Sequence, residues 1–253
     1  MSPAECRHHA LSLLRESIGD SRPGKSTVLP FGIDAIDGRL ADGGLMLGGL
    51  HEVSPATATL SDDAAATLFT VGIAARAAAQ SRRRVLWALT RFDLYAPGLE
   101  QAGLDPATLL FVEAREDKEV LAVMEDGLRH GGLAAVVGEV KRADMVATRR
   151  LQLAAMTGGT PALLARRWRK VGTCPLGELS AAMTRWRIAC APSARLPAPG
   201  VGRARWTVEL ARQRGGPGFT MALEACDDTG RLALPAAPRD RTIAAAGAAA
   251  RAA

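Results

Sequence analysis

The feature that most constrains the fold is a series of apolar, strand-length runs that alternate with helical segments. The helical segments carry apolar residues on one side, whereas the runs between them are apolar almost throughout. Strands that are apolar on both faces are typical of a parallel sheet covered by helices on both sides. We therefore expect an α/β fold, with strands at residues 49–53, 84–90, 109–114, 133–140 and 161–166 and helices at residues 64–80, 98–103, 116–129 and 143–156.

Residues 42–66 have the layout of a phosphate-binding loop without its ligands. Gly43 and Gly44 favour a tight turn before the first strand, and Ser61 is expected to cap the following helix, with Asp62 and Asp63 in its first turn. The connecting loop has neither the lysine nor the glycine nest that bind phosphate. The two aspartates are either a built-in anion, stabilised at a helix N-terminus by about 0.3–1 kcal/mol, or ordinary first-turn residues. Both interpretations predict a poor ATP site.

A literal G-x-x-x-x-G-K-S sequence occurs at residues 19–26. A working phosphate-binding loop follows a strand and begins a helix. Here a short amphipathic helix is expected at residues 1–18, and the residues after Ser26 are extended and interrupted by Pro30. The motif therefore lies in the wrong context, and we expect that it does not bind nucleotide.

Length and composition favour one class of protein over several others. A chain of 253 residues, 48% of them apolar, can bury one substantial core. No apolar run approaches the ~20 residues that a membrane span needs, and the charges throughout residues 1–19 do not match a signal peptide. The four cysteines lack the spacing of metal ligands and are typical of reduced cytosolic cysteines. We expect a cytoplasmic protein that contacts no membrane.

The charge is unevenly distributed along the chain. Residues 141–214 contain fifteen Lys or Arg and three acidic residues, a net charge of +12, whereas the remainder of the chain has a net charge of −6. A basic segment of this kind favours an anionic partner, either nucleic acid or an acidic protein surface. The alternative is an arginine-rich, solvated surface without a partner.

The last third of the chain predicts a C-terminal β-hairpin. We expect a small helix, a strand, a proline-rich loop, a hairpin of two strands and a third short strand, followed by a disordered alanine-rich tail. In that order these segments cover residues 176–183, 184–188, 191–202, 203–210 with 219–225, 231–234 and 235–253.

Arginine and tryptophan occur close together at several places in the basic segment. The candidate partner-binding or DNA-binding residues are Arg166, Arg167, Arg169, Lys170, Arg185, Arg187, Arg203, Arg205, Trp206, Arg212 and Arg214. This combination suits single-stranded DNA, through phosphate contacts and base stacking, and it equally suits a protein interface. A third interpretation is local. Because successive strand residues face opposite sides, a tryptophan can belong to the core while its neighbouring arginines lie on the surface.

Two segments resemble RecA-type recombinases. Residues 43–53 (GGLMLGGLHEV) are similar to the sequence that leads into their nucleotide-binding loop, and residues 30–37 (PFGIDAID) are similar to a stretch before it. The resemblance implies a RecA-like core. In RecA-type ATPases the strand equivalent to residues 84–90 ends with a catalytic glutamate, but here it ends in Thr90 and Arg91 follows.

The position equivalent to the magnesium-linked Walker B aspartate falls near Gly138. Its neighbour Glu139 either replaces that aspartate or is a sheet-end carboxylate that pairs with Lys141 or Arg142. The phosphate-binding loop with its lysine, the catalytic glutamate and the metal ligand are thus all missing or altered. Phosphoryl transfer depends on these groups for positioning and charge neutralisation. We therefore expect no enzymatic activity, no catalytic residues, no cofactor and no bound metal.

A RecA-like core without Walker motifs, followed by TRWRI at residues 184–188 and RARWTVELARQRGGPG at residues 203–218, resembles the ImuA family. The resemblance covers about residues 30–234. It implies a non-catalytic accessory factor of SOS-induced, error-prone translesion DNA synthesis. The implied partners are ImuB, an inactive relative of Y-family polymerases, and an error-prone C-family polymerase, with RecA and single-stranded DNA as further candidates.

On this basis the chain has four parts. They are an N-terminal helix and lead-in loop, a RecA-like core, a basic β-hairpin extension and a tail, at residues 1–29, 30–192, 193–234 and 235–253.

The sequence leaves two other functions open. One is a divergent RecA-type ATP-binding protein or ATPase that uses Lys25 or another loop. The other follows from the distant similarity of the ImuA family to SulA, a RecA-fold inhibitor of cell division, and implies binding to FtsZ. Affinity for ATP would distinguish the first alternative, and a pull-down with FtsZ would distinguish the second.

Overall fold

The computed structural model describes residues 28–168, 174–193, 200 and 202–235. The expected helix at residues 1–18, the motif at residues 19–26 and the tail from residue 236 lie outside these ranges and stay predictions. No helix in the described ranges has the length and apolar character needed to span a bilayer.

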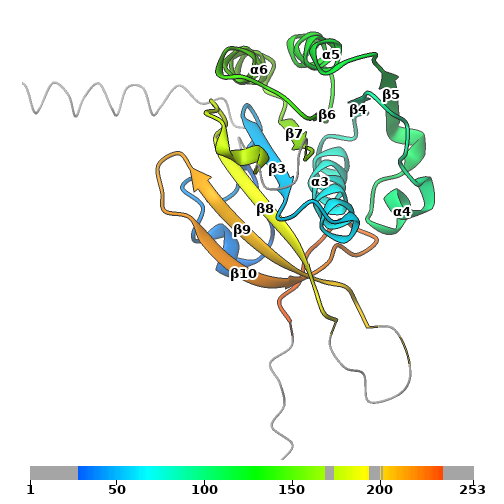
Figure 1. Ribbon diagram of the computed structural model, residues 1–253, viewed down its shortest axis with the longest axis vertical. Coiled ribbons are helices and arrows are strands. Elements are labelled where there is room, and N and C mark those ends of the chain that lie inside the picture. The colour runs from blue at the N-terminus through cyan, green and yellow to red at the C-terminus, as the bar shows by residue number, and fades with distance from the viewer. Residues whose placement is uncertain (1–27, 169–173, 194–199, 201, 236–253) are drawn as a thin grey trace, which may run out of the picture.

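The core is one eight-stranded sheet with the order β10-β9-β8-β3-β7-β6-β4-β5 (Figure 1). The strands from β8 to β5 in that order are parallel, β9 is antiparallel to β8, and β10 is antiparallel to β9. This sheet confirms the expected mostly parallel α/β fold with an antiparallel C-terminal hairpin. The strands are β3 (Leu50–Pro55), β4 (Val85–Leu89), β5 (Leu109–Glu113), β6 (Ala135–Val140), β7 (Ala162–Arg166), β8 (Thr184–Ala191), β9 (Arg205–Gln213) and β10 (Phe219–Glu224).

Helices cover both faces of the parallel part of the sheet (Figure 1). α3 (Leu60–Ser81) packs on the face to which Trp87 of β4 points, and α5 (Asp117–His130) and α6 (Met145–Gly158) pack on the opposite face, against Leu86. Successive strand residues therefore pack into two separate apolar cores, one on each face of the sheet, as the continuous apolar runs predict. The short helical elements are α2 (Asp34–Asp37), α4 (Ala96–Gln101), η1 (Pro106–Thr108) and η2 (Pro175–Gly177).

A two-stranded ribbon precedes the sheet, formed by β1 (Val28–Leu29) and β2 (Leu45–Met46) in antiparallel pairing. Gly43 in the turn before β2 has a φ of 70°, as the expected tight turn requires. Gly44 is needed for a different reason, because a Cβ atom there would lie 2.9 Å from the carbonyl oxygen of Leu29. The ribbon can close only with a residue that has no side chain at this position.

The helix expected at residues 176–183 is wrong. Only η2 is helical, and the chain after it is extended because its backbone groups bond to other elements. The Ala181 N–H donates to Thr148 Oγ1 on α6 at 3.2 Å, and the Met183 N–H donates to the carbonyl oxygen of Leu50 on β3 at 2.8 Å. Tertiary hydrogen bonds therefore override the local helical pattern.

Two boundaries near the hairpin also differ. β9 continues to Gln213, three residues beyond the expected strand, because the Gln213 side chain accepts the Ala41 N–H and donates to the carbonyl oxygens of Arg39 and Pro217. The third short strand expected at residues 231–234 is a single bridge, in which Ala233 pairs with Glu224.

The burial and the hydrogen bonds of His51 favour a neutral imidazole. Nε2 lies 2.8 Å from the carbonyl oxygen of Met46, which can only accept, so this nitrogen carries the proton. Nδ1 lies 2.8 Å from Thr184 Oγ1, which donates to it and in turn accepts the indole N–H of Trp186. Burial lowers the pKa of His51 to about 4, and the hydrogen bond to Met46 offsets this only in part.

This histidine predicts a loss of stability in mild acid. The pKa of His51 is about 4 in the folded protein and 6.5 in the unfolded chain, so the unfolded state gains the proton first. Stability then falls as the pH drops from about 7 to 4, by about 3 kcal/mol in total. In urea unfolding, His51→Gln should show a shallower decline between pH 7 and 5 than the native sequence. Identical slopes would contradict the neutral, buried state.

Candidate functional site

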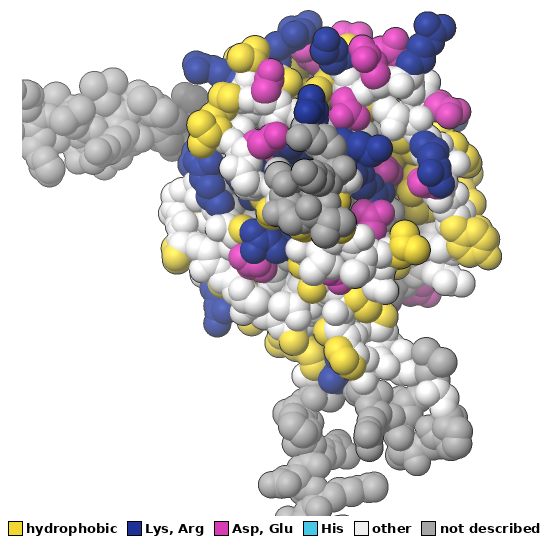
Figure 2. All heavy atoms as spheres, in the orientation of Figure 1, with side chains coloured by type: hydrophobic (Ala, Val, Ile, Leu, Met, Phe, Trp, Pro, Cys, Tyr) yellow, Lys and Arg dark blue, Asp and Glu magenta, His cyan; other side chains and the backbone are white. Residues whose placement is uncertain are grey.

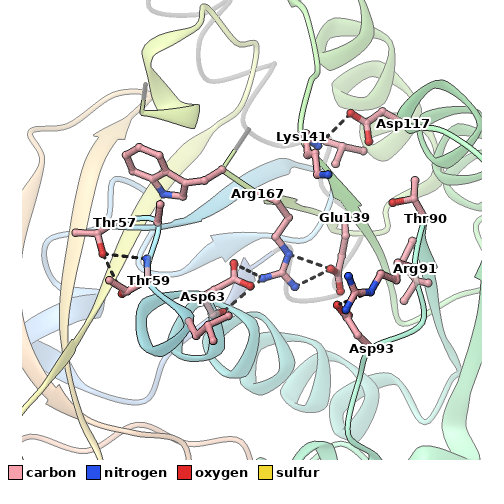
Figure 3. Close-up of a pocket in the computed structure, with 15 residues that line it drawn as sticks. Thr57, Thr59, Asp63, Thr90, Arg91, Asp93, Asp117, Glu139, Lys141 and Arg167 are labelled. Atoms are coloured by element: carbon pink, nitrogen blue, oxygen red, sulfur yellow. Dashed lines mark hydrogen bonds and ion pairs between the residues drawn. The ribbon is translucent and has the colours of Figure 1, made fainter. Parts of the chain in front are cut away.

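An open cavity of about 270 Å³ lies at the carboxyl ends of β3, β4, β6 and β7 (Figure 3). In open parallel sheets, ligands usually bind at this edge. The loop between β3 and α3, the residues after β4 and β6, and Arg167 and Trp168 after β7 form the wall. The volume lies slightly below the range of about 300–1,000 Å³ typical of small-molecule pockets, and the Arg167 side chain extends across the cavity.

The carboxylate of Asp62 accepts hydrogen bonds from the loop before α3. Thr59 caps the helix, since its Oγ1 accepts the Asp62 N–H at 3.4 Å, so the expected cap at Ser61 is wrong by two residues. The buried Asp62 carboxylate accepts the Thr57 N–H at 3.0 Å, the Thr57 hydroxyl at 2.6 Å and the Cys190 N–H at 2.7 Å. Donors that would face a phosphate in a nucleotide-binding loop are here bonded to Asp62.

Arg167 joins three elements across the cavity (Figure 3). Its Nη1 donates to Asp63 Oδ1 on α3 at 2.7 Å, and its Nη2 donates to Glu139 Oε2 on β6 at 2.6 Å. The indole N–H of Trp87 on β4 donates to the other Glu139 oxygen at 2.8 Å. Burial by itself would lower the pKa of Arg167, but the attraction of Glu139 and Asp63 outweighs burial and raises the pKa. The guanidinium is therefore charged and fixed.

Glu139 lies at the end of its strand, as one of the two interpretations held, but its partner is Arg167. The expected pairing with Lys141 or Arg142 is wrong. Those two residues donate their backbone N–H groups to Asp117 Oδ2 in the first turn of α5, at 3.1 and 2.9 Å, and their side chains are exposed. Among the described residues, no group of three or more His, Cys, Asp or Glu is placed to hold a metal ion.

Three of the candidate binding residues are buried. Arg166 donates to Glu52 Oε1 and to Glu178 Oε2, both at 2.9 Å, and Arg185 Nε donates to Glu52 Oε2 at 2.6 Å. These ion pairs compensate for the hydration that the buried charges lose. Trp206 lies in the core, as the local interpretation held for a tryptophan of this kind. Arg166, Arg185 and Trp206 are 0%, 7% and 2% exposed, so their side chains offer almost no surface to DNA or a partner.

Three further candidates are partly exposed but have partners within the protein. Arg187 pairs with Glu209 on the neighbouring strand at 2.9 Å, and Arg205 pairs with Glu224 at 3.7 Å. Arg203 donates to the backbone carbonyl oxygens after β10. These arginines stabilise the hairpin, which reduces their freedom to contact a partner.

The candidates most available to a partner lie at the end of β9 and in the turn after it. Arg212 and Arg214 are exposed. Arg212 makes a long hydrogen bond of 3.4 Å to the Ser180 carbonyl oxygen, and the Arg214 side chain makes no ion pair with a described residue. Arg169 and Lys170 lie outside the described residues and stay predictions.

The sequence analysis named Asp63, Glu139 and Arg167, but it listed Arg167 as a candidate contact for DNA or a partner, whereas the structure pairs this arginine with the two carboxylates. The signal was present, because Asp63 follows β3, Glu139 ends β6 and Arg167 follows β7, and the carboxyl ends of parallel strands meet at one edge. The missing fact was the strand order. With β7 between β3 and β6, Arg167 must lie between the two carboxylates.

The fold and the site define a RecA-like protein in which internal ion pairs lie where a nucleotide-binding loop would hold phosphate. The crystal structure of the RadB recombinase has the same fold, with a TM-score of 0.55 and 16% sequence identity over 82% of this chain and 99% of that chain. No protein-family model matches the chain.

Sequence similarity over three quarters of the chain then identifies the family. Protein ImuA of Caulobacter vibrioides strain NA1000 / CB15N is 43% identical over 194 residues, which cover 75% of this chain and 80% of that protein. Protein ImuA of strain ATCC 19089 / CIP 103742 / CB 15 matches to the same extent. The chain belongs to the ImuA family.

Removal of the central guanidinium should destabilise the protein. In Arg167→Ala the carboxylates of Asp63 and Glu139 lose their shared cation, and breaking a buried pair costs about 3–5 kcal/mol. Asp63 is 40% exposed, so we expect a loss near the lower limit, about 3 kcal/mol, in the free energy of urea unfolding.

The matched control is Arg91→Ala at the mouth of the same cavity. Its ion pair with Asp93 is 3.6 Å long and largely exposed, so the expected loss is below about 1 kcal/mol. Equal, small losses in both variants would show that the Arg167 cluster does not stabilise the sheet edge.

Proposed function

We propose that this protein is a non-catalytic, RecA-like accessory factor of SOS-induced, error-prone translesion DNA synthesis. In this role it assembles with ImuB and an error-prone C-family polymerase, and RecA and single-stranded DNA are further candidate partners. The observation that carries the proposal is the cluster of Asp63, Arg167 and Glu139, in which side chains of the protein neutralise one another at the edge where a nucleotide would bind. The process and the partners follow from the resemblance to the ImuA family.

The cluster is unfavourable for phosphoryl transfer. That reaction needs a phosphate cradle, a metal ligand and a residue that positions the nucleophile. Glu139, the carboxylate nearest to the metal-ligand position, is bonded to both Arg167 and Trp87, so binding of Mg²⁺ would have to break these contacts. Asp63 places a further negative charge beside the helix N-terminus. These features support a role in binding, without turnover of a substrate.

A divergent ATP-binding protein is the second candidate function. The specific observation in its favour is the cavity itself, which lies at the ligand-binding edge of the sheet and has the exposed Lys141 in its wall. A lysine there could meet a phosphate from the side opposite to α3. The two candidates differ in whether the negative charges of Asp62 and Asp63 exclude a triphosphate.

Calorimetric titration with Mg²⁺-ATP separates these two functions. We expect no binding tighter than about 1 mM, equivalent to about −4 kcal/mol, because the phosphates would meet Asp62 and Asp63. Titration with Mg²⁺ alone provides the control for heats of dilution and metal binding. Micromolar affinity that is lost in Lys25→Ala or Lys141→Ala would overturn the non-catalytic proposal.

The exposed turn after β9 is the best-placed described segment for contact with DNA. We expect Arg212→Ala combined with Arg214→Ala to weaken binding of single-stranded DNA and to lower the salt slope by about 1.4, as loss of two phosphate contacts requires. Fluorescence anisotropy at several salt concentrations measures both effects. Arg91→Ala combined with Arg115→Ala removes two exposed arginines elsewhere and should leave binding unchanged. An unchanged slope in the Arg212 and Arg214 variant would exclude DNA contact through this turn.

A further inference from the structure

The outer face of α6 is apolar where a surface helix should be polar. Met145, Val146, Leu153 and Met156 are between 41% and 68% exposed. At 3.6 residues per turn they share an arc of about 100°. Leu151, Ala154 and Ala155 are buried against the sheet on the opposite side of the helix. A helix with apolar residues on both sides is typical of one that is covered on both sides.

The exposed residues form a continuous stripe along the helix. From Met145 to Met156 the helix rises about 16 Å, which is the length of contact that one packed helix makes. Two of the four residues are methionines, whose flexible side chains adapt well to a partner surface. Single exposed apolar residues need no explanation, whereas a contiguous group on a helix marks an interaction surface.

The charged residues within α6 are all basic, although Asp144 caps its N-terminus. α6 contains no acidic residue and two exposed arginines, and Arg149 lies within the apolar arc. Arg150 beside it shares the single carboxylate of Glu125 on α5 with Arg129. Two guanidinium groups against one carboxylate leave a net positive charge. Figure 2 shows apolar side chains beside Lys and Arg, and also Asp and Glu, at the upper edge of the molecule, where α6 lies in Figure 1.

A second copy of the chain is a poor occupant for this face. In a two-fold symmetric contact, a residue near the centre of the helix faces its own counterpart. Arg149 and Arg150 lie near the midpoint of α6, so two copies would bring like charges together. A partner with acidic residues beside its apolar contacts would instead neutralise them.

We propose that the outer face of α6 docks an amphipathic helix of a partner protein, with apolar residues against Met145, Val146, Leu153 and Met156 and a carboxylate against Arg149. The inference rests on the proposed function, because it assigns a surface to the partner assembly named there. The face lies on the side of the sheet opposite to α3 and is separate from the charged cavity.

The test is a binding titration of the full chain with purified ImuB. Val146→Asp combined with Leu153→Asp should weaken binding at least 30-fold, because both introduced carboxylates would meet apolar and acidic groups of the partner. Arg149→Glu should weaken binding about tenfold, and Arg149→Lys should retain most of it. Tyr95→Asp is the matched control, since Tyr95 is 73% exposed before α4 and is not part of the cavity wall, and its affinity should be unchanged. Thermal unfolding and circular dichroism of each variant should remain at native values.

The possible results separate a failure of the docking surface from a failure of the proposed function. If the native chain fails to bind ImuB, the assigned partner is wrong and this inference falls with it. If the native chain binds and the Val146 and Leu153 variant binds equally well, only the docking surface is wrong. Sedimentation that shows a native dimer and a monomeric variant would also overturn the inference, because the face would then join two copies of the chain.

Discussion

The guanidinium of Arg167 holds together the carboxyl edge of the parallel sheet. It follows β7, the strand between β3 and β6, and bonds to Asp63 beyond the first and to Glu139 at the end of the second. Without it, two carboxylates would share a half-buried space, a situation that favours either local repulsion or uptake of a proton. The cation therefore fixes where α3 begins relative to β6 and keeps the cavity narrow.

Arg166, the residue before Arg167, links strands on the opposite face of the sheet. Arg166 points away from Arg167, because successive strand residues face opposite sides, and pairs with the buried Glu52 on β3, which also binds Arg185 on β8. Consecutive arginines thus link β7 to β3 on one face of the sheet and to α3 and β6 on the other. Buried ion pairs of this kind are weak sources of net stability, but removing one partner leaves an uncompensated charge. They specify the arrangement of β3, β7 and β8 more than they strengthen it.

The sequence predicted the fold better than it predicted the site. Apolar runs predicted β3, β4, β5, β6 and β7, because a strand that is buried on both faces has apolar residues at nearly every position. The segment at residues 176–183 failed, since its backbone donors bond to Thr148 and Leu50, which are distant in the chain. Arg166 and Arg185 failed for a similar reason. An arginine beside a tryptophan has the same local sequence whether it faces solvent or a buried carboxylate such as Glu52.

These ion pairs also bear on how such a protein can be regulated. A RecA-like site that bound nucleotide would adjust its sheet edge to the charge of the phosphates, and the surfaces connected to that edge would respond. Here Arg167 already bonds to Asp63 and Glu139, and Asp62 already accepts hydrogen bonds from Thr57 and Cys190. A ligand can shift a conformational equilibrium only if it binds one state more tightly than the other. Because these hydrogen bonds hold the sheet edge in one conformation, a nucleotide would have no second conformation to favour. In the proposed role, α6 and the basic turn after β9 are therefore presented continuously, and assembly depends on the concentration of the partners.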